Sequence, residues 1–191
     1  MTNVLIVVDL QNDFTEGGSL GVKGGNVTAA SITAHIRAHK SRYSRVIASR
    51  DWHSPDGDNG GHFAVKPDMV TTWPRHCVQG TIGSAYNPAL ELELIDIQIY
   101  KGDGQPAYSA FEGKTPGGAS LDDVLRKAKA KHLDIVGIAS DHCVRATALD
   151  AIARGYTVTV LVDLCVGVAP ATTIAAIAEM TAAGVDIRFS E

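Results

Sequence analysis

Six short runs of β-branched and other apolar residues recur along the chain, separated by longer segments of helical character. The runs are VLIVVDL from Val4, RVIASRD from Arg45, IQIYKG from Ile97, LDIVGIAS from Leu133, TVTVLVD from Thr157 and VDIRFS from Val185. Nearly continuous apolar strands that alternate with helices are typical of a parallel sheet covered on both faces. The sequence therefore predicts an α/β fold with a doubly wound, mainly parallel six-stranded sheet and helices on both faces.

Four segments between these runs have the residue types and spacing of helices; they span 26–40, 120–131, 143–154 and 171–183. Ser120 and Pro170 are typical residues for a helix start, and Gly155 stands where a helix commonly ends. With 191 residues, of which 45% are hydrophobic, the chain suits one compact domain, and we expect residues 1–191 to form it.

The charged residues show no concentration that would attract a polyanion or a membrane surface. Lys and Arg are scattered and the formal net charge is −4, whereas nucleic-acid binding needs a basic patch or stripe. The first apolar run lacks a basic leader, is much shorter than a membrane span and ends at Asp9. We therefore expect a cytoplasmic protein, monomeric or a small homo-oligomer, that acts on small molecules and binds neither nucleic acid nor membrane.

Two long segments, about 54–89 and 102–119, interrupt the regular alternation and are rich in Gly, Pro and isolated aromatic residues. Connections of this length in a compact domain are usually either functional or disordered. The aromatic side chains favour order, because disordered segments contain few of them. We therefore expect both segments to be functional.

Chemically capable side chains lie where the predicted strands end. Asp9 closes the first run, Asp51 closes the second with His53 just beyond it, Lys101 closes the third, and Cys143 follows the fourth by a few residues. In an open parallel sheet, ligands bind beyond the carboxyl ends of the strands. We therefore expect these groups to share one rim of the molecule.

Cys143 is a candidate nucleophile because it stands where a predicted strand ends and a predicted helix begins. Unpaired N–H groups and the helix dipole at such a position favour the thiolate, and the same N–H groups can receive an oxyanion. The alternative is a buried structural thiol, which is common for free cysteine. The position of Cys143 at the start of a predicted helix favours a reactive nucleophile over a structural thiol.

A thiol nucleophile needs a base, and Asp9 is a better candidate than His142. Adjacent residues of a helix do not face each other, so His142 is poorly placed to take the Cys143 proton. A carboxylate at the end of an apolar strand is partly desolvated, which raises its pKa toward a useful range. Taken alone, Asp9 could equally be a turn or cap carboxylate. Lys101 on the same rim could pair with Asp9, although a lone lysine more commonly extends to solvent.

Four residues form a candidate ligand set for a metal. Asp51 and His53 are two apart, so in extended chain both side chains point the same way. With His62 and His76 they make a mixed carboxylate and imidazole set that suits Zn, Fe(II) or Mn(II). Each histidine could instead be an ordinary core or surface residue. A metal would order a loop that has few apolar residues of its own.

Other polar features are interpreted as structural. Cys77 is adjacent to His76 in the chain and is expected to pack rather than bind metal, and Cys165 ends a core strand. Asp56 and Asp58 are expected in turns. The stretch GDGQPA at 102–107 fits the dinucleotide-binding pattern only loosely and opens no helix, so a turn is expected there too.

The ordered set of motifs resembles the nicotinamidase branch of the isochorismatase-like cysteine hydrolases. The resemblance covers nearly the whole chain, through VDLQNDF, SRDWHSPDGDNGGHF, WPRHCVQGTIG, YSAF and GIASDHCVRATALDA. Each motif is modest alone, but their joint presence in this order is specific. It implies an isochorismatase-like, Rossmann-like three-layer sandwich with a metal-binding loop region around residues 51–89.

The resemblance also implies roles for individual residues. It implies a triad of Asp9, Lys101 and Cys143 and a metal held by Asp51, His53, His62 and His76. It implies an oxyanion hole from the N–H groups of Ala139 and Cys143, after a cis peptide bond between Ile138 and Ala139. It also implies a pocket wall of Phe14, Leu20, Trp73, Tyr108 and His142. The implied reaction is hydrolysis of nicotinamide to nicotinate and ammonia through a thioester, in NAD salvage, with pyrazinamide as a second substrate.

Two other functions stay open from the sequence. A related amidohydrolase acting on N-carbamoyl or other small amides would share the triad but need no metal. A small-molecule or metal-binding protein without enzymatic activity could also have kept the fold. Metal content and the dependence of ammonia release on Cys143 distinguish the three.

Overall fold

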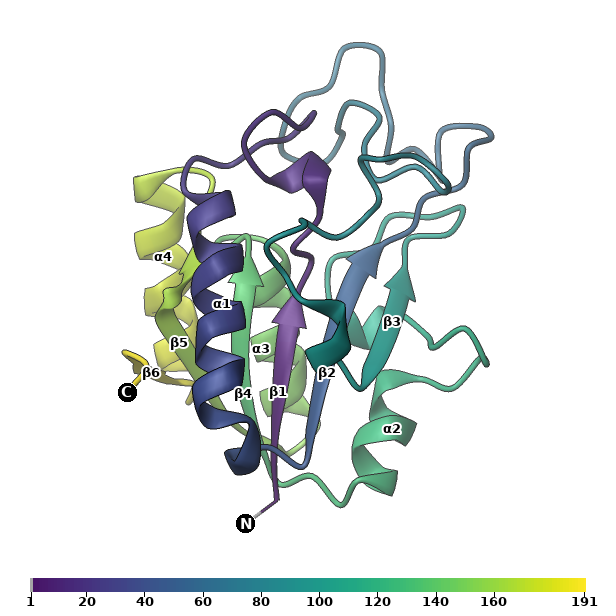
Figure 1. The fold of residues 1–191 in the computed structure, drawn as a ribbon. Helices are drawn as coiled ribbons and strands as arrows, with labels where there is room; N and C mark the ends of the chain where they lie inside the picture. Colours follow the sequence, from purple (N-terminus) through teal and green to yellow (C-terminus); the bar gives the residue numbers. More distant parts are fainter. Residues whose placement is uncertain (1) are drawn as a thin grey trace.

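All six predicted strands are present in the computed structural model, which describes residues 2–191. The strands are β1 (Asn3–Val8), β2 (Arg45–Asp51), β3 (Ile97–Lys101), β4 (His132–Ile138), β5 (Thr157–Val166) and β6 (Asp186–Arg188). They form one sheet in the order β3-β2-β1-β4-β5-β6, and each neighbouring pair is parallel (Figure 1). The predicted doubly wound sheet is confirmed.

The strand order reverses between β1 and β4. From β1 the sheet extends to one side through β2 and β3, and to the other side through β4, β5 and β6. A reversal of this kind opens a crevice at the carboxyl ends of the two central strands. The arrowheads of β1, β2, β3 and β4 in Figure 1 point to the same edge, and the long irregular segments gather there. This edge is where a ligand site is expected.

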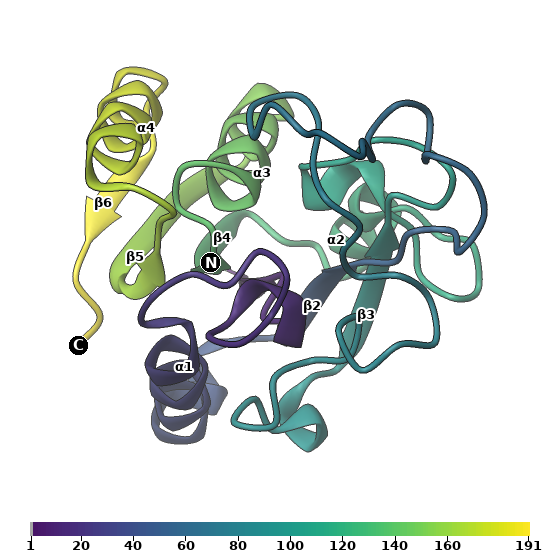
Figure 2. The same ribbon diagram turned by 90° about the horizontal axis from the view of Figure 1, so that it is seen from above.

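Helices cover both faces of the sheet. They are α1 (Gly25–His39), α2 (Leu121–Lys127), α3 (Cys143–Ala153) and α4 (Pro170–Ala182), with short 3₁₀ turns η1 (Asn12–Phe14), η2 (Lys40–Arg42), η3 (Leu92–Leu94) and η4 (Ala110–Glu112). Seen from above, α1 lies on one face, and α2, α3 and α4 lie on the other (Figure 2). The three-layer sandwich follows from this arrangement.

The two core layers follow from the alternation of side chains along the central strand. In β1, Leu5 and Val7 belong to the buried layer that α1 shares, whereas Val4, Ile6 and Val8 belong to the layer shared with α2 and α3. All five side chains are fully buried. Successive residues of a strand point to opposite faces, so a continuous apolar run fills both layers.

Local signals fix most helix boundaries. The Ser120 side chain caps α2 by accepting from the Asp123 N–H, Pro170 is the first residue of α4, and Gly155 follows the end of α3 with a φ of 85°. These three expectations are confirmed. The second helix is shorter than predicted and ends at Lys127, because Lys129 takes a left-handed conformation with a φ of 54°.

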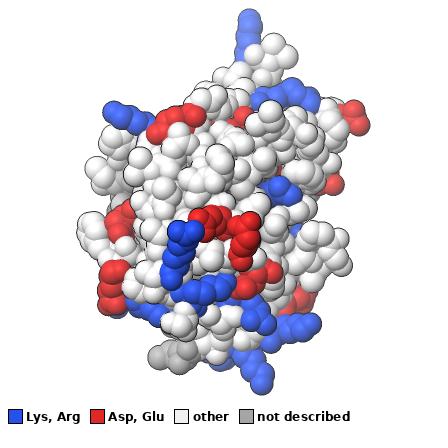
Figure 3. All heavy atoms as spheres, viewed as in Figure 1, with Lys and Arg blue, Asp and Glu red and all other residues white. Residues whose placement is uncertain are grey.

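Charged side chains of both signs are interspersed on the face of the molecule that Figure 3 shows. Within residues 2–191 no helix is long and apolar enough to cross a membrane.

Candidate active site

Four chemically capable residues come from four neighbouring strand ends. Asp9 directly follows β1 in a left-handed conformation with a φ of 48°, Asp51 is the last residue of β2, and Lys101 is the last residue of β3. Cys143 begins α3 after the turn that leaves β4. All four are buried. The predicted rim therefore exists, and it lies under the surface.

Lys101 is the centre of this group. Its Nζ lies 2.9 Å from Asp9 Oδ2, forms a short contact with Asp51 Oδ1, and lies 3.7 Å from Cys143 Sγ. The other Asp9 oxygen accepts a hydrogen bond of 2.7 Å from the Ser49 hydroxyl. The lysine therefore pairs with Asp9 as expected, and it also pairs with Asp51, which the sequence did not predict.

Burial and charge shift the two carboxylates in opposite directions. Burial raises the pKa of Asp9, and the nearby Lys101 offsets this only in part. Burial would also raise the pKa of Asp51, but the adjacent Lys101 ammonium acts against it, and that pKa lies well below its usual range. The two carboxylates raise the pKa of Lys101 well above its usual range, against the effect of burial. Asp9 is thus the carboxylate able to exchange a proton.

Cys143 differs from the expectation of a stabilised thiolate. Burial raises the pKa of its thiol well above the usual range; Lys101 acts against this, whereas Asp9 and Asp51 add to it. The start of α3 does not outweigh desolvation and two neighbouring carboxylates. The proton therefore rests on sulfur until a base takes it.

The turn before Cys143 presents two backbone donors. The peptide bond between Ile138 and Ala139 is cis, as the family resemblance implied. Within residues 2–191 the N–H groups of Ala139 and Cys143 donate to no other protein group, whereas the Val144 N–H donates to the Ala139 carbonyl. Both residues line the same cavity. Free backbone N–H groups are donors of the kind that can stabilise an oxyanion.

Three buried histidines gather beside this group. One nitrogen from each of His53, His62 and His76 lies within 4.8 Å of those of the other two. Asp51 Oδ2 lies 3.5 Å from His53 Nε2 and 3.6 Å from His76 Nε2. The structure therefore brings the four predicted ligands together, with one Asp51 oxygen facing Lys101 and the other facing the imidazoles.

The hydrogen bonds of these imidazoles leave nitrogen lone pairs free for a metal. Nδ1 of His53 lies 2.7 Å from the Gly102 carbonyl and Nδ1 of His76 lies 2.8 Å from the Pro74 carbonyl, so each Nδ1 carries the proton. Buried His53 Nε2 and His62 Nδ1 have no hydrogen-bond partner among the described residues. Burial, with the neighbouring His53 and His76, lowers the pKa of His62 to about 4, which keeps it neutral. The donor set fits a divalent transition metal.

Gly102 supports His53 in a way that only glycine allows. Its φ is 83°, and a Cβ there would lie 2.5 Å from His53 Cε1. We expect Gly102→Ala to cost about 1–3 kcal/mol of backbone strain and also to displace the imidazole. Thermal unfolding with and without zinc measures both effects. Gly104→Ala is the matched control, because Gly104 has a φ of 73° and open space around it. Equal zinc stabilisation in the two variants would contradict the contact.

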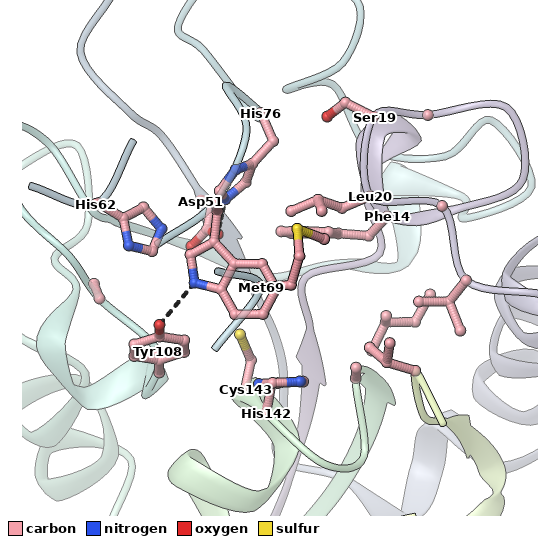
Figure 4. Close-up of a pocket in the computed structure, with 18 residues that line it drawn as sticks. Phe14, Ser19, Leu20, Asp51, His62, Met69, His76, Tyr108, His142 and Cys143 are labelled. Atoms are coloured by element: carbon pink, nitrogen blue, oxygen red, sulfur yellow. Dashed lines mark hydrogen bonds and ion pairs between the residues drawn. The ribbon is translucent and has the colours of Figure 1, made fainter. Parts of the chain in front are cut away.

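The buried groups open into a cavity of about 390 Å³. Its lining includes all five predicted wall residues: Phe14, Leu20, Trp73, Tyr108 and His142. In Figure 4 the Cys143 sulfur points into this cavity, with Asp51, His62 and His76 across from it. The cavity therefore exposes the thiol and the histidine cluster to the same ligand.

Hydrogen bonds and ring contacts fix the aromatic walls. The Trp73 indole N–H donates to the Tyr108 hydroxyl at 2.9 Å, and the His142 ring meets the Trp73 ring edge-on at 5.3 Å. The Tyr108 N–H donates in turn to Glu112, whose side chain caps η4. A cavity walled by aromatic side chains suits a planar ring. His142 is thus a wall residue, and the structure gives it no contact with the thiol proton.

Comparison with known proteins agrees with this geometry. Residues 3–191 match the isochorismatase domain model. The chain belongs to the isochorismatase family. It is 46% identical to a nicotinamidase/pyrazinamidase of Mycobacterium tuberculosis, over 96% of each chain.

Two solved structures are similar throughout. A pyrazinamidase of Pyrococcus horikoshii in complex with zinc superposes with a TM-score of 0.84 at 35% identity, covering 100% of both chains. PnC1 from L. infantum in complex with nicotinate superposes with a TM-score of 0.83 at 35% identity, covering 98% of this chain and 92% of that one. The isochorismatase-like fold is therefore shared along the whole chain.

Several residues of this isochorismatase-like site were missed by sequence reasoning. Ser49 precedes Asp51 by two positions on β2, so the same alternation that grouped Asp51 with His53 could have found it. Met69 and Asn59 carry no such signal. Met69 lines the cavity, and buried Asn59 bonds both backbone groups of Ser54 through its side-chain amide. These contacts depend on how the long loop folds.

The remaining polar residues are placed as expected. Cys77 is fully buried, and burial raises the pKa of its thiol well above the usual range. Burial raises the pKa of Cys165 to about 12, which makes that thiol unreactive. Asp56 and Asp58 are exposed. The stretch 102–107 contains a turn and begins no helix.

Proposed function

We propose that this protein is a nicotinamidase that hydrolyses nicotinamide to nicotinate and ammonia through a Cys143 thioester, serves NAD salvage, and also deamidates pyrazinamide. The observation that carries the proposal is one cavity that is lined by Cys143, with Lys101 and Asp9 buried behind the thiol, and also by Asp51, His62 and His76 of the candidate metal site. The names of the similar proteins support the same activity. Residues 1–191 would form one hydrolase domain, with segment 51–89 as its metal-binding region.

Acylation begins with the protonated thiol that the buried site favours. Asp9 accepts the Cys143 proton while Sγ bonds to the carboxamide carbon. The carbonyl oxygen takes the electron pair as an oxyanion, which the N–H groups of Ala139 and Cys143 receive. Asp9 then returns the proton to the amide nitrogen, the C–N bond breaks, and ammonia leaves a thioester behind.

Deacylation uses the same residues, with water in place of the thiol as the nucleophile. Asp9 accepts a proton from a water molecule as the water oxygen bonds to the thioester carbon. The C–S bond breaks, the thiolate regains the proton from Asp9, and the product leaves as the carboxylic acid, which loses its proton to water to give nicotinate. Lys101 remains charged throughout, because its pKa lies well above the usual range. It therefore offsets the carboxylate charge and holds Asp9 beside the sulfur.

Asp51, His53, His62 and His76 would hold one divalent metal, for which zinc, iron(II) and manganese(II) are candidates. Such a metal would supply Lewis acidity for the ring nitrogen of the substrate, which would orient the ring. Trp73, Tyr108 and Phe14 confine the ring plane so that the carboxamide faces Cys143. Correct placement of the two reacting atoms supplies part of the rate enhancement.

Three substrates test the proposal with one ammonia assay. We expect rapid release from nicotinamide and pyrazinamide and much slower release from benzamide, which has the same shape but lacks the ring nitrogen. Equal turnover of benzamide and nicotinamide would contradict the orienting role of the metal. Faster turnover of an N-carbamoyl amide, unaffected by chelation, would favour the metal-independent amidohydrolase instead.

A further inference from the structure

Residues 11–14 contact the candidate metal site, because the Phe14 ring lies 5.5 Å from the His76 ring and the Gln11 side chain bonds to Asp51, yet their polar side chains belong neither to the histidine cluster nor to the triad. Gln11 is fully buried. Its side-chain Oε1 accepts from the Asp51 N–H at 2.8 Å, and its Nε2 donates to the Asp51 carbonyl at 2.8 Å and to the Ser84 carbonyl at 3.0 Å. The amide of Gln11 thus binds both backbone groups of a predicted ligand.

The sheet explains why this amide is needed. β2 pairs with β1 only as far as Ala48, because β1 ends at Val8. Beyond that point the Ser49 carbonyl accepts from the Asp9 N–H, and the Gln11 side chain takes the place of a β1 backbone unit beside Asp51. The last residue of β2 therefore keeps a partner on its β1 side.

Asp13 contacts the metal-binding region at a different point, beside His76. Its Oδ2 accepts from the Cys77 N–H at 2.7 Å. Cys77 directly follows His76 and has a φ of 47°, and its carbonyl accepts from the His53 N–H at 3.1 Å. The carboxylate also packs against Gly83, where a Cβ would lie 2.1 Å from Asp13 Oδ2. One carboxylate therefore fixes the backbone beside two histidines.

We propose that Gln11 and Asp13 are positioning residues that hold Asp51, His53 and His76 at the spacing a metal requires. Both act through the backbone and contact no substrate. The inference rests on the metal site of the proposed function. It goes further because it attributes the fixed positions of the metal ligands to a segment outside the metal-binding region. Outer contacts that orient ligands control affinity as well as geometry.

Four single variants test this. Gln11→Met keeps the length of the side chain and removes its three hydrogen bonds. Asp13→Ala removes the acceptor for the Cys77 N–H, whereas Asp13→Asn keeps one carbonyl oxygen there. Asn12→Ala is the control from the same turn, because the Asn12 side chain donates to the Ile82 carbonyl at 2.8 Å and touches no ligand backbone.

The readouts are the zinc dissociation constant, measured by competition with a chromophoric chelator, and the visible spectrum of the cobalt(II)-loaded protein. We expect Gln11→Met and Asp13→Ala to bind zinc roughly 10- to 100-fold more weakly and to change the cobalt spectrum. Asp13→Asn should recover most of the affinity, and Asn12→Ala should match the native protein. A structural role alone would lower the melting temperature of the metal-free variants and leave the zinc dissociation constant unchanged.

Each outcome decides between the two proposals. If the native protein binds zinc and Gln11→Met and Asp13→Ala bind it equally tightly, the positioning roles are wrong and the proposed function stands. If the native protein binds no zinc, cobalt, iron or manganese, the metal site and the positioning roles both fail. If Gln11→Met does not fold, the comparison of Asp13→Ala with Asp13→Asn still decides the inference.

Discussion

Cys143→Ala protein is expected to release ammonia from nicotinamide about 10⁴-fold or more slowly than native protein, with an unchanged melting temperature. Removal of a nucleophile ends covalent catalysis, and the remaining binding groups and N–H donors supply only a small residual rate. The methyl group of alanine is smaller than the thiol and faces a cavity, so the fold should tolerate it. Ammonia release under saturating substrate and thermal unfolding measure the two effects.

Cys165→Ala is the matched control for this variant. Cys165 lies on β5 and contacts the core, and its thiol is not part of the cavity wall. Its replacement should leave the rate unchanged. Native protein quenched in acid during turnover should carry the mass of one nicotinoyl group, and Cys143→Ala should not. Ammonia release by Cys143→Ala at the native rate would overturn the thioester mechanism.

The sequence predicted the rim because strand ends can be read from it. Each apolar run of β-branched residues stops at a polar residue, and parallel strands bring those stops to one edge. Asp9, Asp51, Lys101 and Cys143 could therefore be grouped without coordinates. The family resemblance added the cis peptide bond before Ala139 and the wall residues, which no periodicity indicates.

The charge balance inside the site could not be predicted in the same way. It depends on distances between side chains from different strands, such as the contact of Lys101 with Asp51 as well as Asp9. The expectation of a Cys143 thiolate failed for this reason, because a helix start indicates a local field but not the burial that opposes it. The roles of Gln11 and Asp13 were hidden too, since both act through long-range backbone contacts.

Lys101→Met is expected to lower the free energy of unfolding of the metal-free protein by about 3–5 kcal/mol at neutral pH and to abolish ammonia release. The substitution leaves the buried carboxylates of Asp9 and Asp51 without their cation, and an uncompensated buried charge is costly. Methionine matches the length of the lysine stem, so packing changes little. Urea unfolding of chelator-treated protein measures the loss. Lys127→Met is the control, because Lys127 is an exposed residue of α2, and its expected change is within about 0.5 kcal/mol.

The loss of unfolding free energy caused by Lys101→Met should also depend on pH, and it should be greater at neutral than at acid pH. In native protein the depressed pKa of Asp51 adds stability above the ordinary carboxyl pKa of about 4, and this is lost as the pH falls through the depressed value. In the variant the pKa of Asp9, already raised by burial, loses the opposing effect of Lys101 and should rise further, so the folded state retains a proton that the unfolded chain releases, and stability declines as the pH rises through the unfolded value. The difference between the two proteins should therefore be largest at neutral pH and shrink toward acid pH. A loss of stability that is equal at pH values on either side of 4 would show that Lys101 acts through packing and not through its charge.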